Sequence, residues 1–179
     1  MISLQELCED IGNFLKTDLF SDYCENGLQV EGKASIQKIA TGVSADLATI
    51  EKAVSLGVDA LIVHHGLFWN GDSFAITGTK KKKLELLLEH GISLLAYHLP
   101  LDGHEEVGNN WKAAKDMGWK NLRPFGEYKG QYLGVAGDIP QKTSVEFQLS
   151  LEKYYNHPSQ KALGGKEEPK NAALVSGGA

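Results

Sequence analysis

The residues best suited to chemistry in this sequence are two adjacent histidines, His64 and His65, at the end of a short apolar run. The run covers residues 60–63, and its β-branched side chains are typical of a strand buried on both faces of a parallel sheet. Side chains at the carboxyl end of such a strand project into the crevice where ligands bind in open α/β sheets. Histidine is the commonest metal ligand and a proton-transfer group near neutral pH. The pair therefore predicts a metal site or a proton-transfer site.

A second apolar segment, residues 91–97, ends in the same way at His98, and Asp102 follows shortly after it. Pro100 cannot continue a hydrogen-bonded ladder, so we expect a turn that leaves Asp102 in the loop beyond the strand. If the two strands are neighbours in one parallel sheet, the three histidines and the aspartate converge on one edge of it. Imidazole and carboxylate ligands suit zinc, iron, manganese or nickel, and the sequence does not select among these metals.

Each of these residues also has an ordinary structural interpretation. A single histidine such as His98 is more often hydrogen-bonded and half-buried, and a single Asp102 more often caps a turn or a helix. The coincidence of two strand ends favours a metal site, because metal ligands cluster in this way. Neighbouring strand residues point to opposite faces, so His64 and His65 would share one ion only if the chain bends there. The easier arrangement gives each imidazole its own ion.

The elements that must position these residues alternate between helices and strands. Ser3 and Glu6 have the pattern of a capping box, which predicts an amphipathic helix at the start of the chain. This helix is followed by a polar loop over 22–32, a strand over 36–43, a helix capped by Ser44 and ended by Gly57, and a helix over 84–89. With the two histidine-bearing strands, this order predicts an α/β fold with a mainly parallel sheet, right-handed βαβ units and flanking helices.

The second half of the chain carries a further series of elements. We expect a helix over 109–117, a strand over 131–136, a helix opened by a Thr143/Glu146 capping box and ending near 155, a polar linker over 156–170, and a strand over 172–175. Residues 1–125 are assigned to a first α/β lobe that carries the metal-site residues, and 126–179 to the start of a second lobe. A strand followed by two glycines normally introduces a helix, so this second lobe is expected to be incomplete.

Composition narrows the functional classes. A formal net charge of −5 argues against a nucleic-acid surface, which is normally basic. No apolar run approaches the length needed to cross a membrane. The two cysteines, Cys8 and Cys24, lack the number and the spacing of a disulfide framework, which fits a reducing cytoplasm. Cys24 could still be a reactive thiol, although nothing near it in the sequence argues for this.

Two further segments invite a functional interpretation. Residues 27–33 match the first seven positions of a P-loop, but Ala34 replaces the Ser or Thr that reaches magnesium, and a strand rather than a helix is expected next. We therefore reject nucleotide binding by that route. The segment 66–79 is a long loop with aromatic side chains, and such loops are often lids or partner contacts. Packing against its own domain explains Trp69 equally well.

Three stretches of the chain together resemble a known family. They are NGLQVEG at 26–32, VHHGLFW at 63–69, and YHLPLDGH at 97–104 continuing to VGNN at 107–110. The combination is similar to the GTP cyclohydrolase type 2 homologues, also called the NGG-interacting-factor-like family of dinuclear metal-binding proteins. The resemblance implies two α/β lobes, two divalent metal ions between them, and a toroidal homohexamer.

By matching positions, the resemblance implies that His64, His65 and Asp102 are metal ligands. It implies that His98 lines the site or supports a ligand, with a role in proton transfer. The family's other ligands are a histidine and a glutamate in a later glycine-rich motif, and we expect this chain to end before that motif, since His157 does not match it. Either the chain is a fragment of a longer protein or it is a natural truncation, and its abrupt ending favours a fragment.

The function that the resemblance implies is hydrolytic. Two metal ions held by imidazoles and carboxylates lower the pKa of a bound water and polarise a substrate bond at neutral pH. The family name suggests purine ring opening of GTP, and another nucleotide or a phosphoester is an alternative substrate. The competing hypothesis is a non-enzymatic metal-binding scaffold or a regulatory protein that binds partners, in which metal stabilises a ring-shaped assembly.

Overall fold

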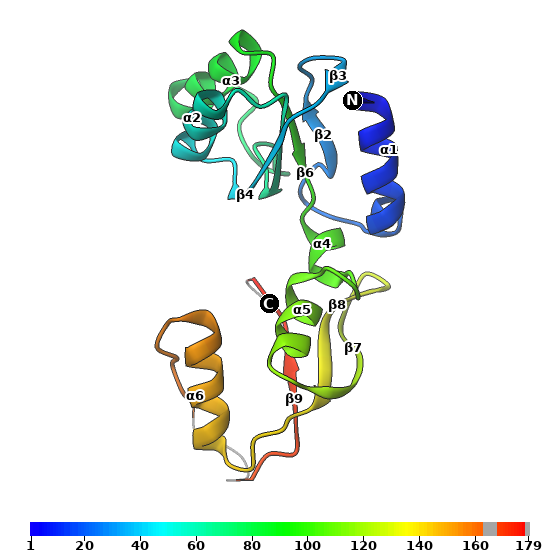
Figure 1. Ribbon diagram of the computed structural model, residues 1–179, viewed down its shortest axis with the longest axis vertical. Helices are drawn as coiled ribbons and strands as arrows, with labels where there is room; N and C mark the ends of the chain where they lie inside the picture. Colours follow the sequence, from blue (N-terminus) through cyan, green and yellow to red (C-terminus); the bar gives the residue numbers. More distant parts are fainter. Residues whose placement is uncertain (163–167, 178–179) are drawn as a thin grey trace. The chain divides into compact units, whose positions relative to one another are not determined.

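The computed structural model describes residues 1–162 and 168–177, and the chain divides into two compact units. The first unit is Met1–Leu101 and the second is Asp102–Ala179 (Figure 1). This division falls earlier than the boundary after residue 125 that we expected from the sequence. The reason is that helix α5 (Asn109–Asp116) packs against strand β8 (Gln131–Asp138) and therefore belongs with the second unit.

The first unit is built around a four-stranded sheet with the strand order β2-β6-β5-β4. Strands β4, β5 and β6 are parallel, and β2 pairs with β6 in the antiparallel direction. Its elements are β1 (Ile2–Ser3), α1 (Leu4–Leu15), a 3-10 turn (Thr17–Leu19), β2 (Gly27–Val30), β3 (Ser35–Ile36), β4 (Ile39–Ser44), α2 (Leu47–Leu56), β5 (Ala60–His65), α3 (Gly78–Glu89) and β6 (Ser93–Ala96). The α/β class and the parallel arrangement of the histidine-bearing strands are as predicted.

Local sequence signals explain most of the helix ends. The Ser3 hydroxyl accepts a hydrogen bond from the Glu6 N–H, and the Glu6 carboxylate accepts one from the Ser3 N–H, so the predicted capping box is present. Helix α2 ends at Gly57 in the left-handed conformation, also as predicted. The prediction that Ser44 caps α2 is wrong, because Ser44 is the last residue of β4 and the Asp46 carboxylate caps the helix through the Thr49 N–H.

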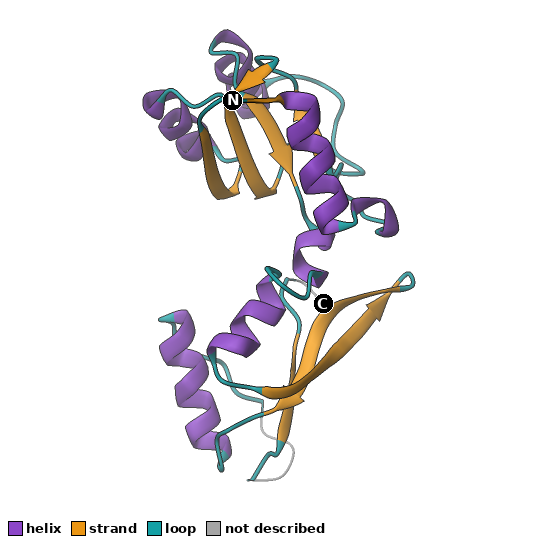
Figure 2. Cartoon of the chain, turned by 45° about the vertical axis from the view of Figure 1, so that its right-hand side comes forward, coloured by secondary structure: helices purple, strands orange, loops and turns teal. Residues whose placement is uncertain are grey.

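Helices lie on both faces of this sheet (Figure 2), and a hydrophobic core fills the space on each face. Along β5, Leu61 and Val63 pack with helices α2 and α3, whereas Ala60 and Ile62 pack with helix α1 on the other face. This is the alternation of a strand that is buried on both sides. It explains why the central strands read as continuous apolar runs and why their polar side chains appear only at their ends.

The sequence did not reveal two elements near the site. Residues 27–30 form β2 within the segment that we expected to be a loop, and the residues after Lys33 form β3, so the P-loop pattern leads into strands and not into a helix. Helix α4 (Leu99–Gly103) replaces the expected turn and loop after His98. Pro100 is compatible with this helix because it lies in the first turn, where its missing N–H has no helical partner.

The second unit is a three-stranded antiparallel sheet, with strand order β7-β8-β9, on which helices α5 and α6 pack. Its further elements are β7 (Lys120–Tyr128), α6 (Ser144–Tyr155) and β9 (Asn171–Leu174). The capping box of Thr143 and Glu146 opens α6 as predicted. The sequence did not predict β7, in which Pro124 and Gly126 interrupt the alternation of a strand. The predicted linker over 156–170 lies partly outside the described residues.

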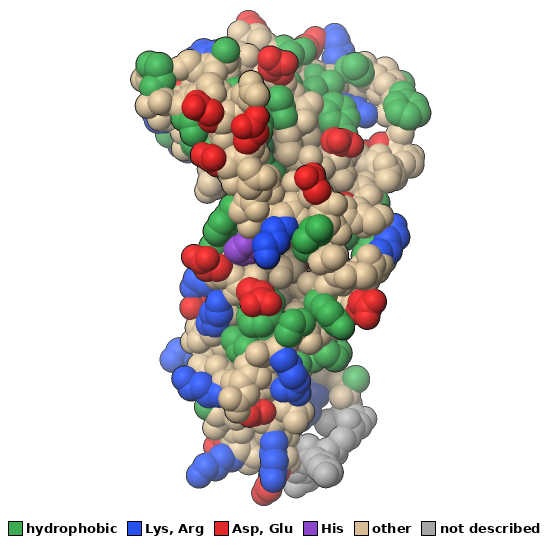
Figure 3. Space-filling view, turned by 90° about the vertical axis from the view of Figure 1, so that its right-hand side faces the viewer, with side chains coloured by type: hydrophobic (Ala, Val, Ile, Leu, Met, Phe, Trp, Pro, Cys, Tyr) green, Lys and Arg blue, Asp and Glu red, His purple; other side chains and the backbone are tan. Residues whose placement is uncertain are grey.

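Over the part of the chain that the structure describes, no helix is both long enough and apolar enough to span a membrane. Figure 3 shows one face of the molecule, on which acidic side chains gather over the first unit and a mixture of basic and acidic side chains covers the second.

Candidate metal centre

Strands β5 and β6 bring three histidines together at their carboxyl ends. The two strands are parallel neighbours with Val63 opposite Ala96, so the residues that follow them emerge at the same edge of the sheet. The ring centroids of His64 and His98 lie 5.1 Å apart, and those of His65 and His98 lie 5.7 Å apart. One ligand nitrogen from each of the three side chains lies within 4.8 Å of the others, which is a group that could hold a metal ion.

His64 and His65 lie closer to each other than their positions on a strand suggest. Their ring centroids are 4.4 Å apart, although neighbouring strand residues point to opposite faces. The His64 ring is hydrogen-bonded toward β6, through the Tyr97 carbonyl, and the His65 ring toward β4, through the Ser44 hydroxyl. Both rings lie at the end of the strand, where side chains of either face can reach past the edge of the sheet.

Hydrogen bonds at Nδ1 decide which nitrogen of each ring suits a metal. The Tyr97 carbonyl can only accept, so His64 donates from Nδ1 over 3.0 Å, which leaves Nε2 as the nitrogen that a metal could use. The ionised Asp22 can likewise only accept, so His98 donates from Nδ1 over 3.0 Å. The His65 Nδ1 lies 3.1 Å from the Ser44 hydroxyl. This arrangement fits a transition metal, because metal-binding histidines donate their other ring N–H to such partners.

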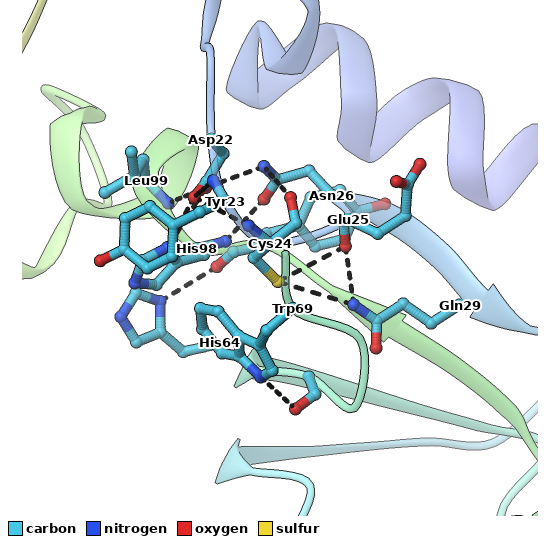
Figure 4. A network of polar contacts seen from close by, with 12 residues as sticks. Asp22, Tyr23, Cys24, Glu25, Asn26, Gln29, His64, Trp69, His98 and Leu99 are labelled. Carbon is cyan, nitrogen blue, oxygen red and sulfur yellow. Dashed lines mark hydrogen bonds and ion pairs between the residues drawn. The ribbon is translucent and has the colours of Figure 1, made fainter. Parts of the chain in front are cut away.

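The buried carboxylate of Asp22 is the main feature of the site that sequence reasoning missed. Its side chain is only 2% exposed, and it accepts hydrogen bonds from His98, from the Asn26 side chain and from the Leu99 N–H (Figure 4). Burial acts to raise the pKa of Asp22, but these hydrogen bonds and one from the Cys24 N–H outweigh it and hold the pKa well below its ordinary value. Asp22 is therefore ionised at neutral pH. The sequence signal was weak, because nothing in a polar loop marks one aspartate as buried.

The loop that carries Asp22 is tied to the histidine strands by amide side chains. Asn26 accepts a hydrogen bond from the His98 N–H over 2.8 Å, and Gln29 accepts one from the Leu67 N–H over 2.7 Å. The Gln29 amide also donates to the Glu25 carbonyl over 2.7 Å. Both amides belong to the NGLQVEG stretch, which therefore holds the loop at Asp22 against the ends of the histidine-bearing strands.

Aromatic side chains line the same region. Trp69 lies edge-on to His98 with a centroid separation of 5.0 Å, and its indole N–H donates to the Gly66 carbonyl. Tyr23, which is 48% exposed, lies 5.2 Å from His98 and 5.7 Å from Trp69 between ring centroids. Trp69 also packs against the core of the first unit, so packing within its own domain accounts for this part of the long loop.

Asp102 lies in the second unit, in helix α4, where it is 5% exposed. Its Oδ1 accepts hydrogen bonds of 2.8 Å from the Asn109 amide and of 2.8 Å from the Ser176 hydroxyl. The prediction that it lies in a loop is wrong, and its role as a metal ligand stays a prediction. Cys24 is buried, and burial raises the pKa of its thiol to about 11, so a reactive thiolate at neutral pH is not supported.

Comparison with known proteins places this arrangement in a family. The family model Duf34/NIF3 (NGG1p interacting factor 3) matches residues 2–179. The chain belongs to the Duf34/NIF3 family. Among curated Duf34/NIF3 relatives, it is 49% identical to the GTP cyclohydrolase 1 type 2 homolog of Chlamydia muridarum, over 99% of this chain and 71% of the relative. It is 42% identical to the protein of the same name from Pyrococcus horikoshii, over 97% of this chain and 70% of the relative.

Solved structures agree with the Duf34/NIF3 assignment. The fold matches protein ybgI, a protein of unknown function, with a TM-score of 0.90 and 38% identity over 99% of this chain and 70% of that one. It matches TTHA1606 from Thermus thermophilus with a TM-score of 0.86 and 39% identity, over 99% of this chain and 71% of that one. The resemblance stated from the three sequence stretches is thereby confirmed.

Proposed function

We propose that this Duf34/NIF3 chain carries the metal centre of a metal-dependent hydrolase. The observation that carries the proposal is the group of three histidines, His64, His65 and His98, whose ligand nitrogens lie within 4.8 Å of one another at the ends of two parallel strands. Catalytic metal sites commonly use three protein ligands and leave a further position open. The name of the curated relatives, GTP cyclohydrolase 1 type 2 homolog, agrees with a hydrolytic reaction.

The residues of the chain have separate tasks in this proposal. A divalent ion would supply an activated water and polarise the substrate bond. His64 and His65 hold their rings against β6 and β4 through the Tyr97 carbonyl and the Ser44 hydroxyl, which limits their rotation. Tyr23 presents an exposed aromatic surface beside the histidines, on which a planar ring of a substrate could stack.

The proposed substrate is GTP, through purine ring opening, and another nucleotide or a phosphoester is the alternative. The proposed centre is dinuclear, with Asp102 as a further ligand, and zinc, iron, manganese and nickel all suit the ligand types. Support for GTP comes from the names of the relatives, whereas support for a hydrolase comes from the histidine group itself. The substrate is the less constrained part, since one fold and site support several substrates.

Metal content and turnover in matched variants test the proposal. We expect the purified protein, loaded with each candidate metal, to bind the metal by elemental mass spectrometry and to hydrolyse GTP or a phosphoester. His65→Ala and Asp102→Ala should each reduce bound metal and lower turnover by at least about 100-fold. The exposed His157 provides the control, and His157→Ala should behave as wild type.

Two results would speak against the hydrolase. Full turnover in folded His65→Ala and Asp102→Ala proteins would show that the metal centre does not carry the reaction. Bound metal without turnover of any nucleotide or phosphoester, combined with loss of assembly in the same variants, would support the metal-binding scaffold instead.

A further inference from the structure

A small cleft lies beside the long loop at 66–79, close to the candidate metal centre but outside it. It has a volume of about 150 Å³, and none of the three clustered histidines lines it. Three aromatic rings, two carboxylates and one ammonium group contribute to its lining, and they belong to Phe68, Trp69, Phe74, Glu25, Asp72 and Lys80. The proposed function makes no use of this cleft.

Backbone hydrogen bonds hold the walls of the cleft in place. The Glu25 N–H donates to the Phe68 carbonyl over 3.3 Å, which joins the two segments that form the cleft. The Asp72 N–H donates to the Trp69 carbonyl over 3.1 Å, and Gly71 between them has a φ of 92°. A positive φ at this position is typical of a type II turn, which glycine permits. The turn returns Asp72 to the side of Trp69, so two different segments each supply a carboxylate to one cleft.

The two carboxylates determine what kind of group a ligand must offer. Neither Glu25 nor Asp72 makes a side-chain hydrogen bond or an ion pair with another residue in the described ranges. Figure 4 shows the Glu25 carboxylate pointing away from His64 and His98. An ionised carboxylate can only accept hydrogen bonds, so a complementary ligand must donate them.

The aromatic walls favour a flat cation. The Lys80 ammonium already lies 5.3 Å from the Phe68 ring centroid and donates to the Ser73 carbonyl over 2.9 Å, so the rings of this cleft attract positive charge. Phe74 is fully exposed, and its ring is therefore accessible to a ligand. A guanidinium group meets these requirements, because it is planar, carries five N–H donors, stacks on aromatic rings and pairs with carboxylates.

We propose that this cleft binds a guanidinium group, which stacks on the aromatic walls and donates hydrogen bonds to Glu25 and Asp72. The group belongs either to an arginine side chain of a partner protein or to a free guanidino compound, since both present the same chemistry. The site requires neither a metal nor a reaction. It therefore goes beyond the proposed function and does not rest on it.

An internal role for the cleft is the alternative interpretation. In that case Lys80 is the only cation that the aromatic walls attract, and Glu25 and Asp72 are ordinary solvated carboxylates. The two interpretations differ in what an added guanidinium does. A cleft completed by Lys80 binds none, whereas a guanidinium site binds it and binds it more tightly once the competing charge of Lys80 is removed.

The first test is the fluorescence of Trp69 in the purified, metal-free protein. Trp69 lines the cleft, whereas Trp111 and Trp119 are buried in the second unit. We expect L-arginine amide to change the fluorescence saturably, and Trp69→Phe should lose this signal. L-lysine amide carries the same charge without a planar group, so at equal ionic strength it should bind at least about 10-fold more weakly.

The second test changes the charges of the cleft and keeps the shapes of its side chains. We expect Glu25→Gln and Asp72→Asn each to weaken the binding of L-arginine amide by about 10-fold, because each removes a charged acceptor. Asp10→Asn is the control, since Asp10 is an exposed carboxylate of the same unit outside the cleft. Lys80→Gln should tighten binding by about 2–5-fold, because it removes a competing cation. Circular dichroism checks that each variant is folded.

Three results would overturn the proposal. They are the absence of a saturable change with L-arginine amide, unchanged affinity in both folded carboxylate variants, and weaker binding in Lys80→Gln with stronger binding in Glu25→Gln, which would indicate an anion site. A blocked tripeptide with arginine between two glycines distinguishes the sources of the group. Binding at least about 10-fold tighter than that of L-arginine amide supports a partner protein, and equal binding supports a free guanidino compound. Because no metal is present, these results are independent of the proposed function.

Discussion

At the scale of single residues, the orientation of the histidines depends on groups that can only accept hydrogen bonds. The carbonyl of Tyr97 and the carboxylate of Asp22 accept and cannot donate, so each of them faces an Nδ1–H group, of His64 and His98 respectively. Two glycines near the site leave no room for a side chain. A Cβ added at Gly66 would lie 2.3 Å from the Gln29 amide, and one added at Gly32 would lie 2.4 Å from the Gly91 carbonyl oxygen.

Replacing the two glycines by alanine should lower the free energy of unfolding by different amounts. Gly66→Ala meets the end of a flexible side chain, so Gln29 can move away and lose its hydrogen bond to the Leu67 N–H, at about 1–3 kcal/mol. Gly32→Ala meets backbone, which cannot move without shifting β2 from the start of β6, so it should cost more than Gly66→Ala. Urea denaturation measures both, with the exposed Asn70→Ala as control. An equal or smaller loss for Gly32→Ala would contradict this account.

At the scale of elements, the carboxylate of Asp59 connects two neighbouring strands, because it accepts hydrogen bonds from backbone N–H groups. Asp59 precedes β5 and accepts from Gln37 and Lys38 at the start of β4, as well as from Lys33. The hydrogen bond from Lys33, followed by those from the two backbone N–H groups, lowers the pKa of Asp59 to about 2. Through these bonds, Asp59 holds β4 in register with the histidine-bearing strand.

This pKa predicts how stability depends on pH. The folded-state pKa of Asp59 lies below its ordinary value of 3.8, so its contribution is complete above about pH 4 and is lost as the pH falls toward 2. Asp59→Asn should therefore lower the free energy of unfolding by about 1–3 kcal/mol at pH 7. Its difference from wild type should shrink as the pH falls from 4 to 2, in urea titrations at each pH. The exposed Asp72→Asn serves as control, and a difference that grows on acidification would rule this account out.

At the scale of the whole molecule, two large apolar side chains in the described part of the chain are exposed to solvent. Phe74 in the long loop is fully exposed, and Val43 on the edge strand β4 is 70% exposed. Exposed apolar side chains that gather into patches commonly mark contacts between proteins. The homohexamer that the family resemblance implies is our proposal for this assembly.

Mass photometry tests the assembly directly. We expect a particle of six times the chain mass of 19.5 kDa. Val43→Asp and Phe74→Ser should reduce the particle mass if these side chains lie in interfaces, whereas the exposed Lys129→Ser should not. A monomer at micromolar concentration would contradict the hexamer.

The sequence by itself determined the features that depend on neighbours along the chain. The two capping boxes, the end of α2 at Gly57 and the two buried strands with a histidine at or shortly after their ends could all be predicted, because caps and alternation act over a few residues. Local patterns also gave two wrong predictions. Asp46 rather than Ser44 caps α2, and Pro100 lies in the first turn of helix α4 where a turn and a loop were expected.

Only the tertiary structure decided which distant groups support the histidines. Asp22 and His98 lie 76 positions apart, and no local pattern marks a loop aspartate as buried. The ring partners of His64 and His65 come from neighbouring strands, and their identity depends on strand order and register. Strand β2 is likewise decided by its pairing with β6. The histidines could be predicted from the sequence because their types and positions are local, whereas the orientation of their rings arises from contacts that only folding creates.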